Sequence, residues 1–273
     1  MKIFTVENSD ILKTDRSTIT MFSNAMVRIP CPAIINGLTS VSLGHPVYKS
    51  AMQQHAGYVE ALQNIGLNVI ILEKDDQHPD STFIEDVALC TADFAVITNP
   101  GAESRRGEIS GIRQVLQEFY DKIEEITSPG TLEAGDVMMT GNHFFIGISS
   151  RTNTYGAEQL INILEKYGMT GTTITLKKML HLKSGVSYLE NNNILVCGEL
   201  TICKDLERFN RIIVDPDESY AANSLWINGK VLVPAGFPST RRKIEMAGYS
   251  TIVLDVSEFR KVDGGLSCLS LRF

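Results

Sequence analysis

The sequence predicts an α/β fold, a five-bladed propeller of pseudo-fivefold ββαβ units. The order strand, strand, helix, strand recurs about five times, and the predicted helices begin near residues 46, 109, 155, 205 and 239. Each unit is too small to bury a core of its own, so units of this kind pack in a ring or a solenoid. Hairpins between the helices disfavour a doubly wound sheet, which needs mainly single strands there.

The first unit begins with an extended segment, Met26–Pro30. Residues 46–65 carry apolar side chains at helical spacing, with Pro46 placed for the first turn and Gly66 for the C-terminal cap. Leu67–Leu72 is an apolar strand. The second unit has the predicted strands Asp86–Thr91 and Phe94–Thr98, the helix Ile109–Tyr120 and the strand Lys122–Thr127.

Turn signals separate the strands of the remaining units. Gly141-Asn142 and Asn228-Gly229 have the composition of hairpin turns. The predicted helices are Tyr155–Tyr167, Asp205–Asn210 and Ser239–Ala247. The predicted strands are Asp136–Thr140, His143–Ser149, Thr172–Leu176, Val186–Leu189, Asn193–Val196, Arg211–Val214, Ser224–Ile227, Lys230–Val233, Thr251–Asp255 and Leu266–Leu271.

No linker, charge run or low-complexity segment divides this pattern, so residues 21–273 are predicted to form a single α/β propeller domain. Residues 1–20 lack the apolar core of a signal peptide and are predicted to be an N-terminal extension of unknown role. No apolar run approaches the roughly 18 residues that a membrane helix needs, so no membrane partner is expected.

The composition is that of a globular protein, with 43% hydrophobic and 21% charged residues. A net charge of −7 without a basic stripe argues against nucleic acid as the main partner. The five cysteines have no regular spacing, so we expect free thiols in a reduced, cytoplasmic setting rather than a disulfide framework. No cysteine pair has zinc-type spacing, and neither a metal nor a cofactor is expected.

Polar residues gather where the predicted units begin, and loops at one end of a ring converge on its axis. Asp80, Glu85 and Asp86 lead into an apolar strand, where acids are costly unless they are paired or face a cation. Arg105 and Arg106 precede a helix, and arginine clamps carboxylates bidentately. The alternatives are that the acids lie in a solvated turn and that the arginines are ordinary surface residues. Similar polar segments are Thr131–Val137, Ser150–Thr154 and Leu180–Gly185.

Two side chains could carry proton transfer and nucleophilic attack. Cys268 follows two glycines near the end of the chain and would be a nucleophile if its thiolate were stabilised, although most free cysteines are small buried hydrophobes. His181 alone among the five histidines stands at a change from apolar residues to glycine, and a near-neutral imidazole is a natural proton shuttle. Most lone histidines are not catalytic. Together these residue types suit attack of a thiolate on a guanidinium held by carboxylates.

Six motifs resemble the dimethylarginine dimethylaminohydrolases, which belong to the guanidine-modifying (pentein) superfamily. In chain order they are FIEDVALC (83–90), NPGAESRRGE (99–108), LEAGDVMMTG (132–141), SRTNTYGAE (150–158), HLKSG (181–185) and VDGGLSC (262–268). The resemblance runs from about Met21 to Phe273, and it implies the five-bladed pentein propeller. It also implies hydrolysis of Nω-methylated arginine, asymmetric dimethylarginine or monomethylarginine, to citrulline and an amine through a covalent thiouronium.

The resemblance assigns roles residue by residue. It implies Cys268 as nucleophile, His181 as general acid and base, and Glu133 as the acid that orients this histidine. Leu269 follows Cys268, so only one thiol stands at this position. The implied substrate contacts are Leu38, Asp80, Phe83, Glu85, Asp86, Arg105, Arg151 and Val262.

Two rival interpretations stay open at this point. An arginine deiminase or amidinotransferase of the same superfamily would share the catalytic logic but take another substrate. A non-catalytic binding module occurs on the same propeller, although Cys268, His181 and Glu133 all stand in place in this sequence. The expected partner is a small methylated arginine, and a homodimer is a further possibility that the sequence does not decide.

Overall fold

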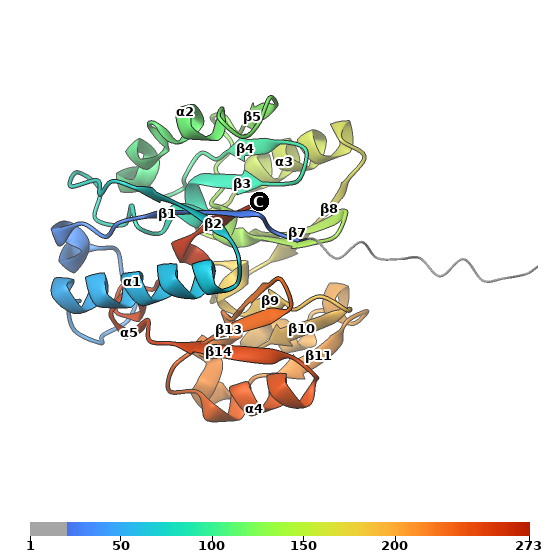
Figure 1. The fold of residues 1–273 in the computed structure, drawn as a ribbon. Coiled ribbons are helices and arrows are strands. Elements are labelled where there is room, and N and C mark those ends of the chain that lie inside the picture. The colour runs from blue at the N-terminus through green and yellow to red at the C-terminus, as the bar shows by residue number, and fades with distance from the viewer. Residues whose placement is uncertain (1–20) are drawn as a thin grey trace, which may run out of the picture.

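Five three-stranded sheets are arranged as the blades of a propeller in this computed structural model, which describes residues 21–273 (Figure 1). In every sheet the middle strand pairs antiparallel with one neighbour and parallel with the other. The predicted five-bladed ββαβ propeller is therefore confirmed. The predicted extension, residues 1–20, lies outside the described residues.

Each sheet consists of an antiparallel strand, the middle strand and a parallel strand, in that order. The first sheet joins the two ends of the described chain, because β15 (Leu271–Arg272) pairs with β1 (Asn24–Arg28), which also pairs with β2 (Asn68–Leu72). The other sheets are β3 (Ala88–Cys90), β4 (Ala95–Ile97) and β5 (Ile123–Glu125); β6 (Val137–Thr140), β7 (His143–Ile148) and β8 (Thr170–Thr175); β9 (Val186–Tyr188), β10 (Asn193–Val196) and β11 (Asn210–Ile213); β12 (Leu225–Ile227), β13 (Lys230–Pro234) and β14 (Ser250–Leu254).

Helices connect the middle strand to the parallel strand in four of the five units. The helices are α1 (Tyr48–Asn64), α2 (Ile112–Leu116), α3 (Thr154–Lys166), α4 (Pro238–Met246) and the short α5 (Ser257–Arg260), which the sequence did not predict. Two predicted turns are confirmed by their backbones. Gly66 has φ +98° at the end of α1, and Asn228 and Gly229 both have positive φ, as a two-residue hairpin requires.

Four predicted elements differ from the structure. Asp205–Asn210 is not a helix but contains part of a 3₁₀ turn, Lys204–Leu206, because so short a segment gains too few hydrogen bonds to offset helix nucleation. The predicted helix Ile109–Tyr120 is reduced to α2, since Gly111 takes φ +81° in front of it. The strand predicted from Asp86 begins only at Ala88. The predicted strand Leu266–Leu271 is mainly a 3₁₀ turn, Ser267–Leu269.

The core is divided into five apolar clusters, each formed largely by neighbouring blades. One cluster packs Tyr58 and Leu62 of α1 against Ile227 and Leu232 of the last blade. Antiparallel strands of neighbouring blades also touch, as β15 with β3, β6 with β9 and β9 with β12. Burial between blades therefore stabilises the ring as a whole and fixes where the loops at its axis meet. Within residues 21–273, no helix is long and apolar enough to cross a membrane.

Candidate active site

Loops from several blades enclose a small cavity of about 30 Å³. It brings together residues that are up to 230 positions apart in the chain (Leu38 and Cys268). Nine of the eleven predicted site residues line it, and the two that do not are Glu85 and Glu133. The nine are Leu38, Asp80, Phe83, Asp86, Arg105, Arg151, His181, Val262 and Cys268.

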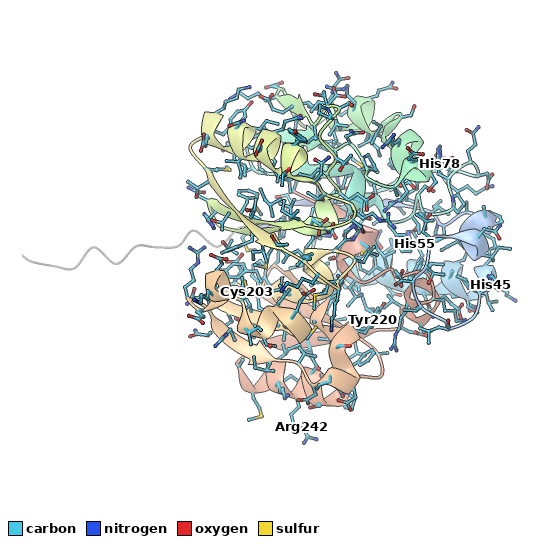
Figure 2. The ribbon with its side chains drawn as sticks, turned by 180° about the vertical axis from the view of Figure 1, so that it is seen from behind. His45, His55, His78, Cys203, Tyr220 and Arg242 are labelled. Carbon is cyan, nitrogen blue, oxygen red and sulfur yellow. The ribbon has the colours of Figure 1, made fainter. Side chains whose placement is uncertain are left out.

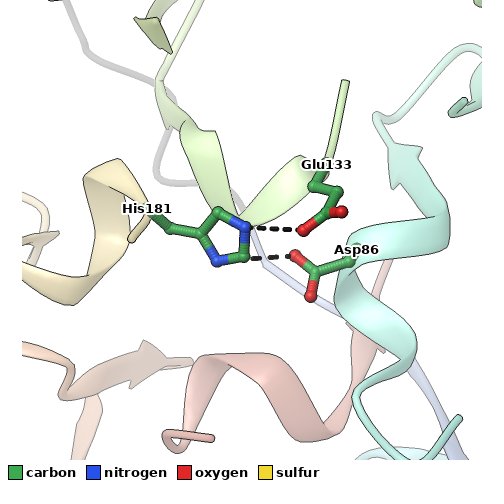
Figure 3. A group of neighbouring side chains, drawn as sticks. All are labelled: Asp86, Glu133 and His181. Atoms are coloured by element: carbon green, nitrogen blue, oxygen red, sulfur yellow. Dashed lines mark hydrogen bonds and ion pairs between the residues drawn. The ribbon is translucent and has the colours of Figure 1, made fainter. Parts of the chain in front are cut away.

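His181 and Glu133 form the predicted hydrogen-bonded pair behind this cavity (Figure 3). The imidazole Nε2 lies 2.8 Å from Glu133 Oε2, and the glutamate side chain is fully buried. Burial opposes protonation of His181, but Asp86 and the bond to Glu133 prevail and raise its pKa to about 9. The imidazole is therefore cationic at neutral pH and ready to donate a proton.

Asp86 lies next to Glu133 on the same side of the imidazole, with its Oδ1 at 4.0 Å from His181 Nδ1 (Figure 3). It accepts hydrogen bonds from the Gly135 amide at 2.9 Å and from Arg105 Nη1 at 2.5 Å. A Cβ on Gly135 would stand 2.6 Å from His181 Nδ1 and 2.7 Å from Asp86 Oδ1. Glycine at this position lets the acid and the imidazole approach each other.

The two arginines among the predicted substrate contacts, Arg105 and Arg151, have different surroundings. Arg105 is buried and gives most of its donors to Glu108, Asp86 and the Phe83 carbonyl. Arg151 donates to Glu133 at 3.3 Å and keeps part of its side chain exposed. Arg151 is thus the freer of the two to meet a ligand carboxylate, while Arg105 is held in a fixed position.

Asp80 and Glu85 have separate environments although both were predicted to contact a cationic ligand. Asp80 accepts a hydrogen bond from the Leu38 amide at 3.0 Å, and burial raises its pKa. Glu85 is paired with Lys183 and Arg272, each at 2.7 Å, and its pKa is lowered because these cations outweigh the effect of burial. Its role as a substrate contact stays a prediction.

Cys268 sits on the 3₁₀ turn Ser267–Leu269, and only 9% of its surface is exposed. Burial, reinforced by Glu85 and Asp86, raises the pKa of its thiol to about 12, against a hydrogen bond from the Gly265 amide. The thiol is neutral in the free site. The preceding glycines are explained by close packing, since a Cβ on Gly264 would lie 2.1 Å from the Phe83 ring.

Several residues of this region were assigned no role from the sequence. Glu108 binds Arg105, and Asn223 accepts a hydrogen bond from the Ser267 amide at 3.0 Å. Asp136 accepts hydrogen bonds from the Leu182 amide and the Ser149 hydroxyl, so it joins the loop of His181 to the loop of Arg151. Glu108 and Asp136 lie in motifs already singled out, whereas Asn223 lies in no recognisable pattern.

Asp86, Glu133 and His181 are also the group of described residues that could hold a metal ion, since one ligand atom from each lies within 4.8 Å of the others. The same atoms already form hydrogen bonds with Gly135, Arg105 and one another. The prediction that neither a metal nor a cofactor is needed stays a prediction.

A propeller of five such blades, with a thiol, an imidazole and carboxylates at the meeting point of its loops, defines a member of the guanidine-modifying, or pentein, class. Solved structures share this fold, including the N-terminal domain of the arginine dihydrolase ArgZ, with a TM-score of 0.82 at 17% identity over 91% of this chain and 97% of that domain. At this low identity the likeness shows the fold alone.

The family model described as "N,N dimethylarginine dimethylhydrolase, eukaryotic" matches residues 44–215. The dimethylarginine dimethylaminohydrolase of Pseudomonas aeruginosa is 51% identical over 93% of this chain and 100% of its own length, and that of Streptomyces coelicolor is 33% identical over 91% and 96%. A solved P. aeruginosa structure in complex with citrulline has a TM-score of 0.92 at 50% identity and covers 93% of this chain and all of that one. The chain belongs to the dimethylarginine dimethylaminohydrolase family, which confirms the resemblance.

Proposed function

We propose that this chain hydrolyses Nω-methylated arginine to citrulline and methylamine or dimethylamine. The observation that carries the proposal is the small cavity, in which a thiol and a protonated imidazole face carboxylates suited to a guanidinium and an arginine suited to a carboxylate. The related P. aeruginosa enzyme, whose solved structure holds citrulline, supports the same product.

The reaction begins when the substrate guanidinium enters beside Asp86 and its positive charge favours loss of the Cys268 proton to solvent. The thiolate then attacks the central guanidinium carbon, forming an S–C bond and a neutral tetrahedral adduct. His181 donates its proton to the substituted nitrogen, the C–N bond breaks, and the neutral amine leaves a positively charged thiouronium on Cys268.

Neutral His181 next takes a proton from water, and the resulting hydroxide adds to the thiouronium carbon. The second tetrahedral adduct collapses to citrulline as the C–S bond breaks and the hydroxyl proton is released, which restores the thiol. Glu133 keeps the imidazole oriented through both transfers and stabilises its cationic form. No step needs an oxidant or a reductant.

The test is citrulline release from asymmetric dimethylarginine by the wild type and by Cys268→Ser, with Cys203→Ser as the matched control. We expect loss of activity in the first variant only, and a mass increase corresponding to the thiouronium on the wild-type peptide after rapid quenching. Preference for unmodified arginine would favour an arginine deiminase, and full activity of Cys268→Ser would favour a binding module instead.

We also propose a cytoplasmic location for the protein, because all five cysteines lie in the described residues and all are free. A homodimer stays a prediction, and light scattering on the purified chain would test it. We expect no contact with nucleic acid or a membrane. The protein should therefore be retained neither on DNA-cellulose nor on anionic vesicles.

A further inference from the structure

A second, larger cavity of about 470 Å³ meets the small one at the reacting side chains. Cys268 and His181 line both cavities, so the sulfur and the imidazole stand at the boundary between them. Asp86, Arg105 and Arg151 line only the small cavity. The lining of the large cavity instead includes Glu85, Lys178, Met179, Lys183, Tyr220 and Arg260.

The volumes of the two cavities differ by more than about tenfold. A water molecule needs about 10–15 Å³ of free space for its centre, so the small cavity has room for about two or three waters. The exposed Leu38 lines this small cavity. The large cavity is already open and could take a chain of several methylene groups.

The position of Asp86 in the small cavity determines how a substrate guanidinium would lie between the small and the large cavity. A carboxylate that accepts hydrogen bonds from two guanidinium nitrogens leaves the third nitrogen pointing away from it. A guanidinium whose Nε and unsubstituted terminal nitrogen face Asp86 would turn its substituted nitrogen away from the small cavity, toward His181, Cys268 and the large cavity. This nitrogen is the one that leaves with a proton from His181.

We infer that the large cavity is a leaving-group site, and that the chain accepts Nω-alkyl arginines whose substituent is longer than methyl. The inference rests on the proposed function, because it uses the same thiol and imidazole. Met179 and the ring of Tyr220 (labelled in Figure 2) offer apolar surface to such an alkyl chain.

The test compares citrulline release from Nω-methyl-arginine and Nω-propyl-arginine. We expect the wild-type kcat/KM for the propyl substrate to lie within about tenfold of that for the methyl substrate. Ser219→Phe places a ring in the large cavity without touching the small one. It should lower kcat/KM for the propyl substrate at least about tenfold and change the methyl value less than about threefold.

Ser250→Phe, an exposed serine on β14, is the matched control and should change neither value. A wild type that hydrolyses the methyl substrate but not the propyl one would overturn the leaving-group site. Equal losses for both substrates in Ser219→Phe would overturn it as well, because the cavity would then hold the shared amino-acid end. Failure with every substrate, including the methyl one, would count against the proposed function itself.

A separate observation concerns Glu108, which the proposed mechanism does not use. It is buried, and its two oxygens accept hydrogen bonds from Arg105 Nε at 3.0 Å and Nη2 at 2.8 Å. Asp86 accepts from Nη1, and the Phe83 and Asp80 carbonyls share an Nη2 hydrogen. The second Nη1 hydrogen has no hydrogen-bond acceptor among the described residues, and its nearest carboxylate oxygen there is Glu133 Oε2, 4.0 Å from Nη1, so this donor is left for a ligand. Glu108 therefore decides in which direction this remaining donor points.

We infer that Glu108 is a positioning residue for substrate binding. Glu108→Gln should raise KM about tenfold and change kcat less than about threefold, since it acts on the amino-acid end rather than on the reacting carbon. The matched control is Glu103→Gln in the same 3₁₀ helix, Glu103–Ile109, where the pair with Arg106 is exposed. An unchanged KM in a Glu108→Gln variant, or the same change in Glu103→Gln, would refute the role, and an unchanged melting curve would exclude a general loss of folding.

Discussion

The Cys268 thiol should stay neutral in the free protein and ionise when a cationic ligand binds beside it. Burial with Glu85 and Asp86 nearby raises its pKa from 9.0 to about 12. Three pKa units correspond to about 4 kcal/mol and to about a thousandfold smaller thiolate fraction at a given pH. A guanidinium at about 4 Å in surroundings of effective dielectric constant about 20 contributes about 4 kcal/mol of attraction. The bound cation should thus return the pKa to about 9.

The assay is the ultraviolet absorbance of the thiolate between pH 7 and pH 10, taken as the difference between the wild type and Cys268→Ser. Without ligand we expect almost no thiolate over this range. An amidinium analogue of arginine that has no leaving amine should bring the midpoint near pH 9. Citrulline, which is neutral at the same end, is the control ligand and should leave the titration unchanged.

A midpoint below about pH 9 in the free protein would refute the reasoning, because burial would then not control the thiol. An equal shift by citrulline and the amidinium would also refute it, since the cause would then be occupation of the site and not charge. A shift by the amidinium alone would support activation of the nucleophile by its own substrate.

The contacts of single residues lead to three further predictions. Glu133→Gln should lower kcat for citrulline release about 100-fold with an unchanged melting temperature, because His181 loses its anionic partner; a loss below about threefold would contradict the pairing. Gly135→Ala should lower kcat and reduce the free energy of unfolding by about 1–3 kcal/mol in urea, whereas Gly57→Ala, with open space around it in α1, should not destabilise the protein. His55 (Figure 2) is buried with Nε2 unpartnered, and burial lowers its pKa from 6.5 to about 4. Between these two pKa values the unfolded protein binds more protons at His55 than the folded protein does. The contribution of His55 to the free energy of unfolding is therefore present in full above about pH 6.5 and should fall by about 3 kcal/mol as the pH drops to about 4. Denaturant titrations at pH 5 and pH 7.5 should show that His55→Leu removes this loss of stability.

Local pattern was enough to predict most elements that have a clear period or a turn residue. The helix of residues 46–65 and the hairpin at Asn228-Gly229 depend on spacing and backbone freedom that neighbours in the chain already determine. The 3₁₀ turn that carries Cys268 depends instead on distant partners. Its Ser267 binds Asn223 and Glu85, which are 44 and 182 positions away, and no local pattern records them.

The same limit applied to the site. The motifs singled out Cys268, His181 and Glu133 as candidates, yet they did not distinguish Glu85 from Asp86, which are adjacent acids in one motif. In the structure Asp86 faces the small cavity and Glu85 is paired with Lys183 and Arg272 from other blades. Adjacent residues on a tight turn point to different sides, so only the tertiary partners separate the two acids.

The charges around the cavities explain why substrate binding and thiol ionisation should occur together. Seven acids stand beside seven basic groups, so the site is neutral when all fourteen are charged. A methylated arginine carries a net charge of +1 into this neutral site, where an uncompensated charge is costly. Loss of the Cys268 proton supplies the compensating anion at the carbon to be attacked, and a neutral urea product removes the need for it. The acids are Asp80, Glu85, Asp86, Glu108, Glu133, Asp136 and Asp263, and the basic groups are Arg105, Arg151, Lys178, His181, Lys183, Arg260 and Arg272.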